Sequence, residues 1–249
     1  MTTALFLVAP GALTGAVPGA MIELSGPEGH HAVGVKRVTP GERIDLGDGR
    51  GTVVHCEVVE LTGRDALRAR VGARDVVLRP HPRVTAVQAL PKGDRGELAV
   101  ETLTEVGVDV IVPWQAQRCV ARWTGDRAAK GHARWLSAAR AAGKQARRAW
   151  LPEVANLADT EQVAELVGEA TLAVVLHEDG TVPLADLDMP AAGDIVIVVG
   201  PEGGLSPEEV DRFAAAGGLP CRMGGSVMRT STAGTVAAGV VLSRTDRWA

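Results

Sequence analysis

Short runs of aliphatic and β-branched residues alternate with helical patterns from about residue 83 to the end of the chain, and this alternation limits the possible fold more than any other feature. The apolar runs cover residues 84–90, 108–112, 171–176 and 194–199, and helices are expected at 96–106, 133–148, 160–167, 207–216 and 230–243. Parallel strands need helical crossovers of this kind and are buried on both faces. The pattern therefore predicts an α/β domain built on a parallel sheet.

The first 75 residues differ, because they have strand-like alternation and no long helical pattern. Residues 52–61 place Val54, Cys56 and Val58 on one face and polar side chains on the other. The dipeptide Asp48-Gly49 supplies a turn before this strand. Such strands predict a small β-barrel. The change near residues 75–82 predicts two domains, 1–75 and 76–249.

Composition and cysteine usage limit the class of protein. The chain has 249 residues, of which 46% are hydrophobic, enough to fill a core in each domain. No basic leader precedes the first apolar residues, and no uncharged run approaches the roughly 20 residues of a membrane helix. Cys56, Cys119 and Cys221 are far apart and lack the spacing of a zinc site. We therefore expect a soluble, cytoplasmic protein with reduced thiols and no metal.

Positive charge is concentrated in one segment, although the formal net charge is -4. Residues 117–148 contain nine basic residues and a single acidic one, Asp126. A solvated helix face usually mixes both signs, so the one-sided charge favours a surface that contacts nucleic-acid phosphates. The chain has no tyrosine and only two phenylalanines, which argues against an aromatic platform for stacking bases.

The sequence DIVIVVGPEGGLSPEEV, residues 194–210, has the order strand, glycine loop, helix. Ser206 is a favourable N-cap, Pro207 suits the first helical position, and Ser206 with Glu209 forms a capping-box pattern. Glycines at this edge of a parallel sheet let a ligand approach the backbone closely. The alternative is an ordinary strand-to-helix turn. The tetrapeptide Gly-Pro-Glu-Gly also occurs at residues 26–29, where no comparable strand-to-helix context is expected.

A second glycine loop lies in CRMGGSVMRTSTAGTVAAG, residues 221–239, between a short strand and a helix of small residues. Such a helix can approach another backbone closely, either in a tight core or at a subunit interface. Arg229 stands isolated at the start of this helix and is interpreted as functional, with a structural ion pair as the alternative. His31, which with His30 precedes an expected strand, is interpreted as structural and not catalytic.

Several collinear motifs together resemble the 16S ribosomal RNA uracil-N3 methyltransferases called RsmE, within the SPOUT superfamily. The matching stretches are HHAVGVKRVTPGERIDLGDGRG, QALPKGDRGELAVETLTEVGVDVIVPWQAQRCV, GPEGGLSPEEV and MGGSVMRTSTA. The resemblance covers nearly the whole chain and implies a PUA-like RNA-binding barrel, a parallel-sheet SPOUT domain with a trefoil knot, and a homodimer. It also implies S-adenosylmethionine-dependent methylation of a uridine in 16S ribosomal RNA of the small subunit.

Carried over residue by residue, the family's cofactor site falls in three loops. Its residues are Leu176, His177, Glu178, Val199, Gly200, Pro201, Glu202, Gly203, Gly204, Met223, Gly224, Gly225, Val227 and Met228. Arg229 is the candidate catalytic residue, because a permanently charged guanidinium can stabilise negative charge on the uracil oxygens. Water, His177 or Glu202 would take the N3 proton. The expected phosphate contacts are Lys36, Arg37, Arg118, Arg122, Arg147 and Arg148.

Two positions depart from the family's pattern. Ser231 stands where an RTETA-like motif has Glu, and Lys144-Gln145 stands where the family has a Glu-Gln pair, so carboxylate roles at these positions cannot operate here. Two other functions stay open. One is a SPOUT ribose 2'-O-methyltransferase of transfer or ribosomal RNA, which usually has a Ser-Leu-Asn type third motif. The other is a non-catalytic RNA-binding ribosome-assembly protein, which would not need the glycine loops.

Overall fold

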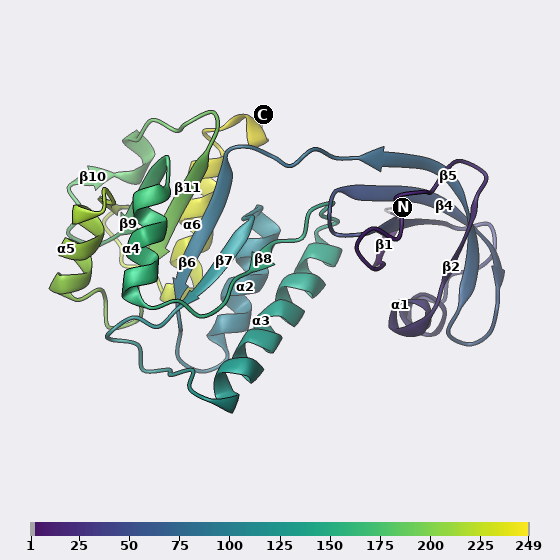
Figure 1. Cartoon of the computed structure of the whole chain (residues 1–249), viewed down its shortest axis with the longest axis horizontal. Helices are drawn as coiled ribbons and strands as arrows, with labels where there is room; N and C mark the ends of the chain where they lie inside the picture. Colours follow the sequence, from purple (N-terminus) through teal and green to yellow (C-terminus); the bar gives the residue numbers. More distant parts are fainter. Residues whose placement is uncertain (1–2, 249) are drawn as a thin grey trace. The chain divides into compact units, whose positions relative to one another are not determined.

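The structure, a computed structural model, describes residues 3–248 and divides the chain into two compact units (Figure 1). The first unit runs to Arg79 and also contains Lys144–Leu151. The second unit consists of Pro80–Gly143 and the chain from Pro152 onward. The division after Arg79 lies close to the change of pattern in the sequence, whereas no sequence pattern signals that Lys144–Leu151 joins the first unit.

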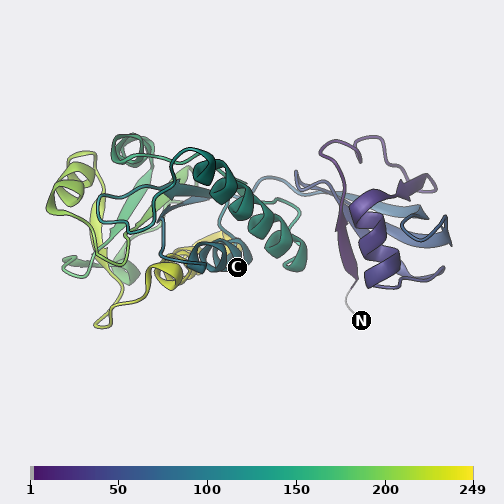
Figure 2. The same cartoon turned by 90° about the horizontal axis from the view of Figure 1, so that it is seen from below.

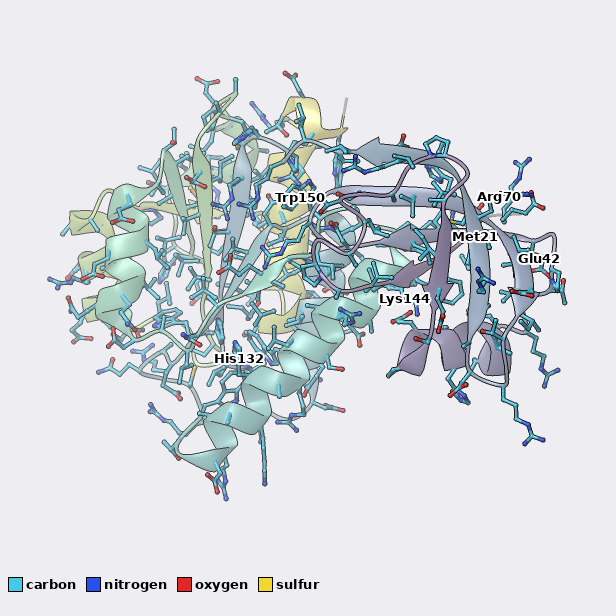
Figure 3. All side chains as sticks on the ribbon, turned by 45° about the vertical axis from the view of Figure 1, so that its right-hand side comes forward. Met21, Glu42, Arg70, His132, Lys144 and Trp150 are labelled. Carbon is cyan, nitrogen blue, oxygen red and sulfur yellow. The ribbon has the colours of Figure 1, made fainter. Side chains whose placement is uncertain are left out.

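The first unit is a curled five-stranded sheet with strand order β1-β3-β4-β5-β2. Strand β1 runs parallel to β3, and the other neighbours are antiparallel. Met21 lies opposite Arg70 on neighbouring strands (Figure 3). The elements are β1 (Ala4–Leu7), β2 (Met21–Leu24), α1 (Gly26–His30), a π-helical turn (His31–Val35), β3 (Arg43–Gly47), β4 (Thr52–Leu61) and β5 (Leu67–Val76).

Strand β4 has the two faces that its sequence predicts. Val54, Cys56 and Val58 are at most 4% exposed and belong to the core of the first unit. The turn before β4 is also confirmed, because one carboxylate oxygen of Asp48 accepts the backbone N–H groups of Arg50 and Thr52 at 2.8 and 3.0 Å. Alternation of period two therefore determines which side of this sheet is buried.

The segment after β2 corrects two expectations. The Gly-Pro-Glu-Gly tetrapeptide at residues 26–29 forms most of α1, so it does follow a strand and begin a helix. Gly29 is required there, since a Cβ atom would lie 2.2 Å from the carbonyl oxygen of Asp65. His31 lies in the helical turn and not before a strand. Its ring meets Phe6 edge-on at 6.0 Å, and burial lowers the pKa of His31.

Within the first unit, Lys144–Leu151 is bound to the turn between β3 and β4 and to the end of β5. The backbone N–H of Gly51 donates to the carbonyl of Ala149 at 2.9 Å. The indole N–H of Trp150 (labelled in Figure 3) donates to the carbonyl of Val77 at 2.9 Å. Gly51 has φ +97°, and a Cβ atom there would lie 2.7 Å from the indole ring. Glycine at this position therefore allows both the turn and the close approach of Trp150.

The second unit contains a seven-stranded sheet in which every pair of neighbours is parallel, as predicted. The strand order is β10-β12-β9-β11-β6-β7-β8. The strands are β6 (Arg83–Ala89), β7 (Val110–Trp114), β8 (Glu153–Val154), β9 (Leu172–Leu176), β10 (Val182–Pro183), β11 (Asp194–Val199) and β12 (Leu219–Arg222). The helices are α2 (Arg95–Val106), α3 (Asp126–Gln145), α4 (Thr160–Glu169), α5 (Pro207–Ala215) and α6 (Thr230–Leu242), with 3-10 turns at Leu184–Asp186 and Asp246–Trp248.

Helices cover both faces of this sheet. Figures 1 and 2 show α4 on one side and α2 with α6 on the other, and α6 packs on β6 and β11. Helix α3 begins seven residues earlier than the sequence pattern suggests and ends at Gln145, not at residue 148. It ends there because Arg147 has φ +55°, a left-handed conformation that a helix cannot continue through.

A buried ion pair connects the 3-10 turn at Asp246–Trp248 with the segment just before β7. The Arg247 guanidinium lies 2.5 Å from the Asp109 carboxylate, and both side chains are less than 10% exposed. Arg247 also donates to the carbonyls of Pro82 and Gly107, and Asp109 accepts the backbone N–H of Val84. These extra hydrogen bonds are what makes burial of the two charges tolerable. Across residues 3–248, no helix combines the length and apolarity needed to cross a membrane.

Candidate functional site

Three loops of the second unit converge at the carboxyl ends of β9, β11 and β12 and line a cavity of about 890 Å³. All fourteen residues proposed for cofactor binding line it. The cavity thus lies where open parallel sheets bind ligands. Its volume is within the usual range for small-molecule sites.

The loop after β11 has a conformation set by hydrogen bonds at both ends. Gly204 has φ +69°, and its backbone N–H donates to the carbonyl of Pro201 at 2.9 Å, which closes a tight turn. At the helical end the predicted capping box is confirmed: the N–H of Glu209 donates to Oγ of Ser206, and the Glu209 carboxylate accepts the N–H of Ser206. A rigid turn followed by a capped helix presents a fixed backbone surface to the cavity.

The loop after β12 provides an open wall of the cavity. A Cβ atom at Gly224 or Gly225 would have no neighbour within 4 Å. Val227 is 80% exposed and Met228 is 37% exposed, although both are apolar. Apolar side chains beside open space indicate a surface that a ligand or a partner can cover.

The loop after β9 is held to β12 by its backbone. The N–H of His177 donates to the carbonyl of Cys221 at 2.9 Å, and its imidazole Nδ1 accepts the N–H of Asp179 at 3.1 Å. Because Nδ1 is an acceptor, neutral His177 carries its proton on Nε2. Glu202 of the glycine loop is exposed, and one of its carboxylate oxygens accepts the N–H of Lys92 at 3.0 Å.

Arg229 lies at the N-cap of α6, next to the cavity-lining residues Met228 and Thr230, but does not itself line the cavity. Its side chain is exposed. Within the part of the chain that the structure describes, no ion pair to Arg229 is found, so the alternative of a structural ion pair at the helix start has no support there.

The predicted phosphate contacts are divided between the two units. Lys36, Arg37, Arg147 and Arg148 belong to the first unit, and Arg118 and Arg122 belong to the second. Three of these side chains bind backbone carbonyls: Arg118 those of Gly203 and Leu205, Arg122 that of Gln117, and Arg148 that of Trp150. Acidic partners from outside the basic segment also appear, since Glu97 binds Arg134 and Glu28 binds Lys144.

Some cavity residues were not predicted from the sequence. They are Arg118, Asp179, Leu205, Pro207, Val210, Asp211, Cys221, Arg222, Ser226, Thr230 and Ala233. Arg222 ends β12, and a charged residue at the carboxyl end of a parallel strand is a signal that could have been used. Arg118 was expected to contact RNA phosphates, but it binds the carbonyl of Gly203 in the glycine loop. The two residues are 85 positions apart, so the sequence pattern could not indicate this contact.

The positions that depart from the family's pattern have other roles. Ser231 is 3% exposed and lies on the side of α6 that faces the core.

The three cysteines are unsuited to catalysis or metal binding. Cys56, Cys119 and Cys221 are free and buried, and burial raises the pKa of each thiol, to about 11 for Cys56. Neutral buried thiols are poor nucleophiles and poor ligands. Among residues 3–248 there is no group of three or more side chains suited to a metal ion.

Comparison with known proteins agrees with this geometry. Residues 79–242 match the family model described as an RNA methyltransferase domain, and residues 24–72 match the model of an RNA methyltransferase PUA domain. A Mycobacterium tuberculosis protein named ribosomal RNA small subunit methyltransferase E is 46% identical over 234 residues, which is 92% of this chain and 89% of the relative.

Two solved structures extend the likeness to the whole fold. A methyltransferase from Legionella pneumophila, in complex with the bound cofactor SAM, has a TM-score of 0.85 and 27% identity, covering 98% of this chain and 99% of its own. Ribosomal RNA small subunit methyltransferase E from Neisseria gonorrhoeae, bound to S-adenosyl methionine, has a TM-score of 0.83 and 25% identity, covering 97% of this chain and 98% of its own. The chain therefore belongs to the RNA methyltransferase family whose members include ribosomal RNA small subunit methyltransferase E.

Proposed function

We propose that this protein transfers a methyl group from S-adenosylmethionine to N3 of a uridine in 16S ribosomal RNA. The observation that carries the proposal is the convergence of three loops on one cavity at the carboxyl ends of β9, β11 and β12. Family membership, together with relatives named for methylation of small-subunit ribosomal RNA, supports the substrate class.

The cavity suits a ligand made of a nucleoside joined to an amino acid. Gly224 and Gly225 leave open space beside the backbone, whose N–H and C=O groups can recognise adenine. Cations and carboxylates that line the cavity can bind the two charges of the methionine part. These charged residues are Arg222, Glu178, Asp179 and Asp211. When bound, S-adenosylmethionine supplies an electrophilic methyl group.

Arg229 is proposed to stabilise the uracil as its N3 proton leaves. Loss of that proton places negative charge on the two flanking oxygens, and a guanidinium held beside them lowers the barrier electrostatically. The exposed position of Arg229 at the rim of the cavity is consistent with a base that arrives from solvent. An arginine cannot act as the base, because it stays protonated.

Glu202 is proposed as the proton acceptor in preference to His177. The basic lone pair of neutral His177 is at Nδ1, where it already accepts the N–H of Asp179. One carboxylate oxygen of Glu202 accepts the N–H of Lys92, and the other has no partner among residues 3–248, so it can take a proton or bind a water that relays it.

RNA phosphates are proposed to bind cations of both units. In the first, PUA-like unit these are Lys36, Arg37, Arg147 and Arg148, and in the second unit it is Arg122.

The second unit is also proposed to contain a trefoil knot and to form a homodimer. Strand β12 is the last strand in sequence yet lies between β10 and β9, an arrangement expected of such a knotted chain. Leu98 of α2 and Val236 of α6 are 45% and 41% exposed on adjoining helices, which favours a homodimer there. Ribosomal RNA as substrate implies a cytoplasmic protein.

The test is to map modified nucleotides in 16S ribosomal RNA from cells with and without this protein. A methyl group on N3 removes a Watson–Crick donor, so reverse transcription should stop at one uridine only when the protein is present. A ribose 2'-O-methyltransferase would instead leave a site resistant to alkaline cleavage, and a non-catalytic assembly protein would leave no methyl group. Either of these outcomes would overturn the proposal.

A further inference from the structure

The loop between β7 and α3 packs against the glycine loop after β11, and side-chain hydrogen bonds connect its two ends. The side-chain amide of Gln115 donates to the carbonyl of Ala121 at 2.9 Å and accepts the N–H of Trp123 at 3.1 Å. Gln115, at the start of the loop, is therefore hydrogen-bonded to two residues near its end. These bonds fix the position of the residues between them, including Arg118.

Arg118 extends from this loop to the carbonyl groups of the glycine loop. Its Nη1 donates to the carbonyl oxygen of Gly203 at 3.2 Å and to that of Leu205 at 3.0 Å. The two backbones are close, because a Cβ atom on Gly203 would lie 3.2 Å from Cβ of Arg118. One guanidinium nitrogen thus joins two peptide groups on either side of Gly204.

Glu209 of the β11–α5 segment also binds the β7–α3 loop, in this case as a hydrogen-bond acceptor. This carboxylate is 3% exposed, and its two oxygens accept the N–H of Gln117 at 2.8 Å and the N–H of Ser206 at 2.9 Å. Consecutive residues of the β7–α3 loop are therefore joined to the β11–α5 segment in both directions: Gln117 donates to Glu209, and Arg118 donates to the carbonyls of the glycine loop.

Each peptide group that Arg118 binds is also bound on its opposite side. The Gly203–Gly204 peptide has its oxygen on Arg118 and its N–H on the carbonyl of Pro201. The Leu205–Ser206 peptide has its oxygen on Arg118 and its N–H on Glu209. Because a peptide group is planar, two opposed hydrogen bonds determine its orientation. The charge of Arg118 makes its bonds stronger than neutral ones.

We infer that Arg118 is a positioning residue of the cofactor site, which holds the glycine loop in the conformation that binds the ligand, and not a phosphate contact. This inference rests on the proposed function, since it assumes that the cavity binds S-adenosylmethionine. It adds a residue that touches neither the reacting methyl group nor the uracil. The basic loop that carries Arg118 is thereby a structural wall of the cofactor cavity.

The experiment compares Arg118→Ala and Arg118→Lys with Arg122→Ala in the full-length protein. Arg122 is the matched control, because it is a cation of the same loop that donates to the Gln117 carbonyl and does not line the cavity. Calorimetry measures the Kd of S-adenosylhomocysteine, steady-state kinetics separates KM from kcat, and hydrogen exchange follows the peptide that contains Gly204 and Ser206.

Arg118→Ala should raise the Kd of S-adenosylhomocysteine and the KM for the cofactor about tenfold or more, with kcat at saturating cofactor within about twofold. Hydrogen exchange at Gly204 and Ser206 should become faster. Arg118→Lys should give an intermediate Kd, because one ammonium group cannot replace the planar guanidinium geometry. Arg122→Ala should keep the cofactor Kd and reduce the slope of log RNA affinity against log salt by roughly 0.7 to 0.9.

Arg118→Ala with wild-type cofactor Kd and a reduced salt slope would make Arg118 a phosphate contact and overturn the inference. A wild-type protein that binds no S-adenosylhomocysteine would instead refute the proposed function. In that case the hydrogen exchange of the ligand-free variant still decides the role of Arg118: unchanged exchange at Gly204 and Ser206 rejects it.

Discussion

The ammonium group of Lys144 lies 2.6 Å from a carboxylate oxygen of Glu28 and 5.0 Å from the ring centre of Phe6. Both charged side chains are only about one-fifth exposed, and the Glu28 carboxylate also accepts the backbone N–H of Leu7. The ion pair therefore binds the segment Lys144–Leu151 to α1 and β1 within the first unit.

Replacing Lys144 by Met should lower the free energy of unfolding by about 1 to 3 kcal/mol, between the values for exposed and fully buried pairs. The reason is that Glu28 would stay partly buried without its cation. Denaturant unfolding measures the change, and Glu28→Gln with Lys144→Met should cost less than the two single changes added together. Arg68→Met is the control, because the Arg68–Glu60 pair is about half exposed and should contribute little.

His55 should make the stability of the first unit depend on pH. Hydrogen bonds to Asp75 and then Asp45 raise the pKa of His55 above its usual 6.5. The stabilisation is therefore complete below pH 6.5, where the unfolded histidine is also charged, and is lost as pH rises through the folded pKa. Denaturant unfolding at pH 6 and pH 9 should show a difference that His55→Gln reduces. An equal difference in that variant would assign the effect to other groups.

Gly225→Val should separate ligand binding from folding. A Cβ atom at Gly225 meets no protein atom within 4 Å, so the thermal midpoint should stay unchanged while the Kd of S-adenosylhomocysteine rises at least about tenfold. Gly203→Val should affect both quantities, because its side chain must displace Arg118. If Gly225→Val binds as tightly as wild type, the loop after β12 does not contact the ligand.

Arg229→Ala should lower turnover by about 10² or more, while RNA affinity and its salt dependence stay nearly unchanged. Lysine should substitute poorly, since it lacks the planar guanidinium that orients the ring. Lys36→Ala is the contrasting variant, expected to weaken RNA binding and to reduce the salt slope by roughly 0.7 to 0.9. Weak RNA binding with normal turnover at saturation in Arg229→Ala would move Arg229 to the phosphate-binding group.

Val236→Asp should convert a dimer into monomers without unfolding the chain, because Val236 is 41% exposed on α6. Ala237 is fully buried on the same helix, so Ala237→Leu should act mainly through the core and lower the thermal midpoint. Sedimentation of both variants and of wild type at micromolar concentration checks this. Wild-type protein that sediments as a monomer contradicts the proposed dimer.

Much of the local structure could be predicted because local patterns determine it. Alternation along β4, the capping box of Ser206 and Glu209, and the apolar runs of the parallel sheet depend on neighbours within a few residues of one another. Each was recognisable from spacing alone. The three loops proposed for cofactor binding could be placed on one cavity because they match family motifs and because parallel strands end at one edge of a sheet.

Only the tertiary structure decided what depends on distant segments. Arg118 donates to carbonyls 85 and 87 residues later in the chain, whereas its basic context in the sequence suggested phosphate binding. The same holds for Lys144, whose partner Glu28 lies 116 residues earlier, and for Trp150, whose acceptor is the carbonyl of Val77. The sequence by itself determined most of the elements, their buried faces and the glycine loops that line the cavity. Which side chains meet across those loops depends on how distant segments pack together, and such contacts leave no periodic pattern in the sequence.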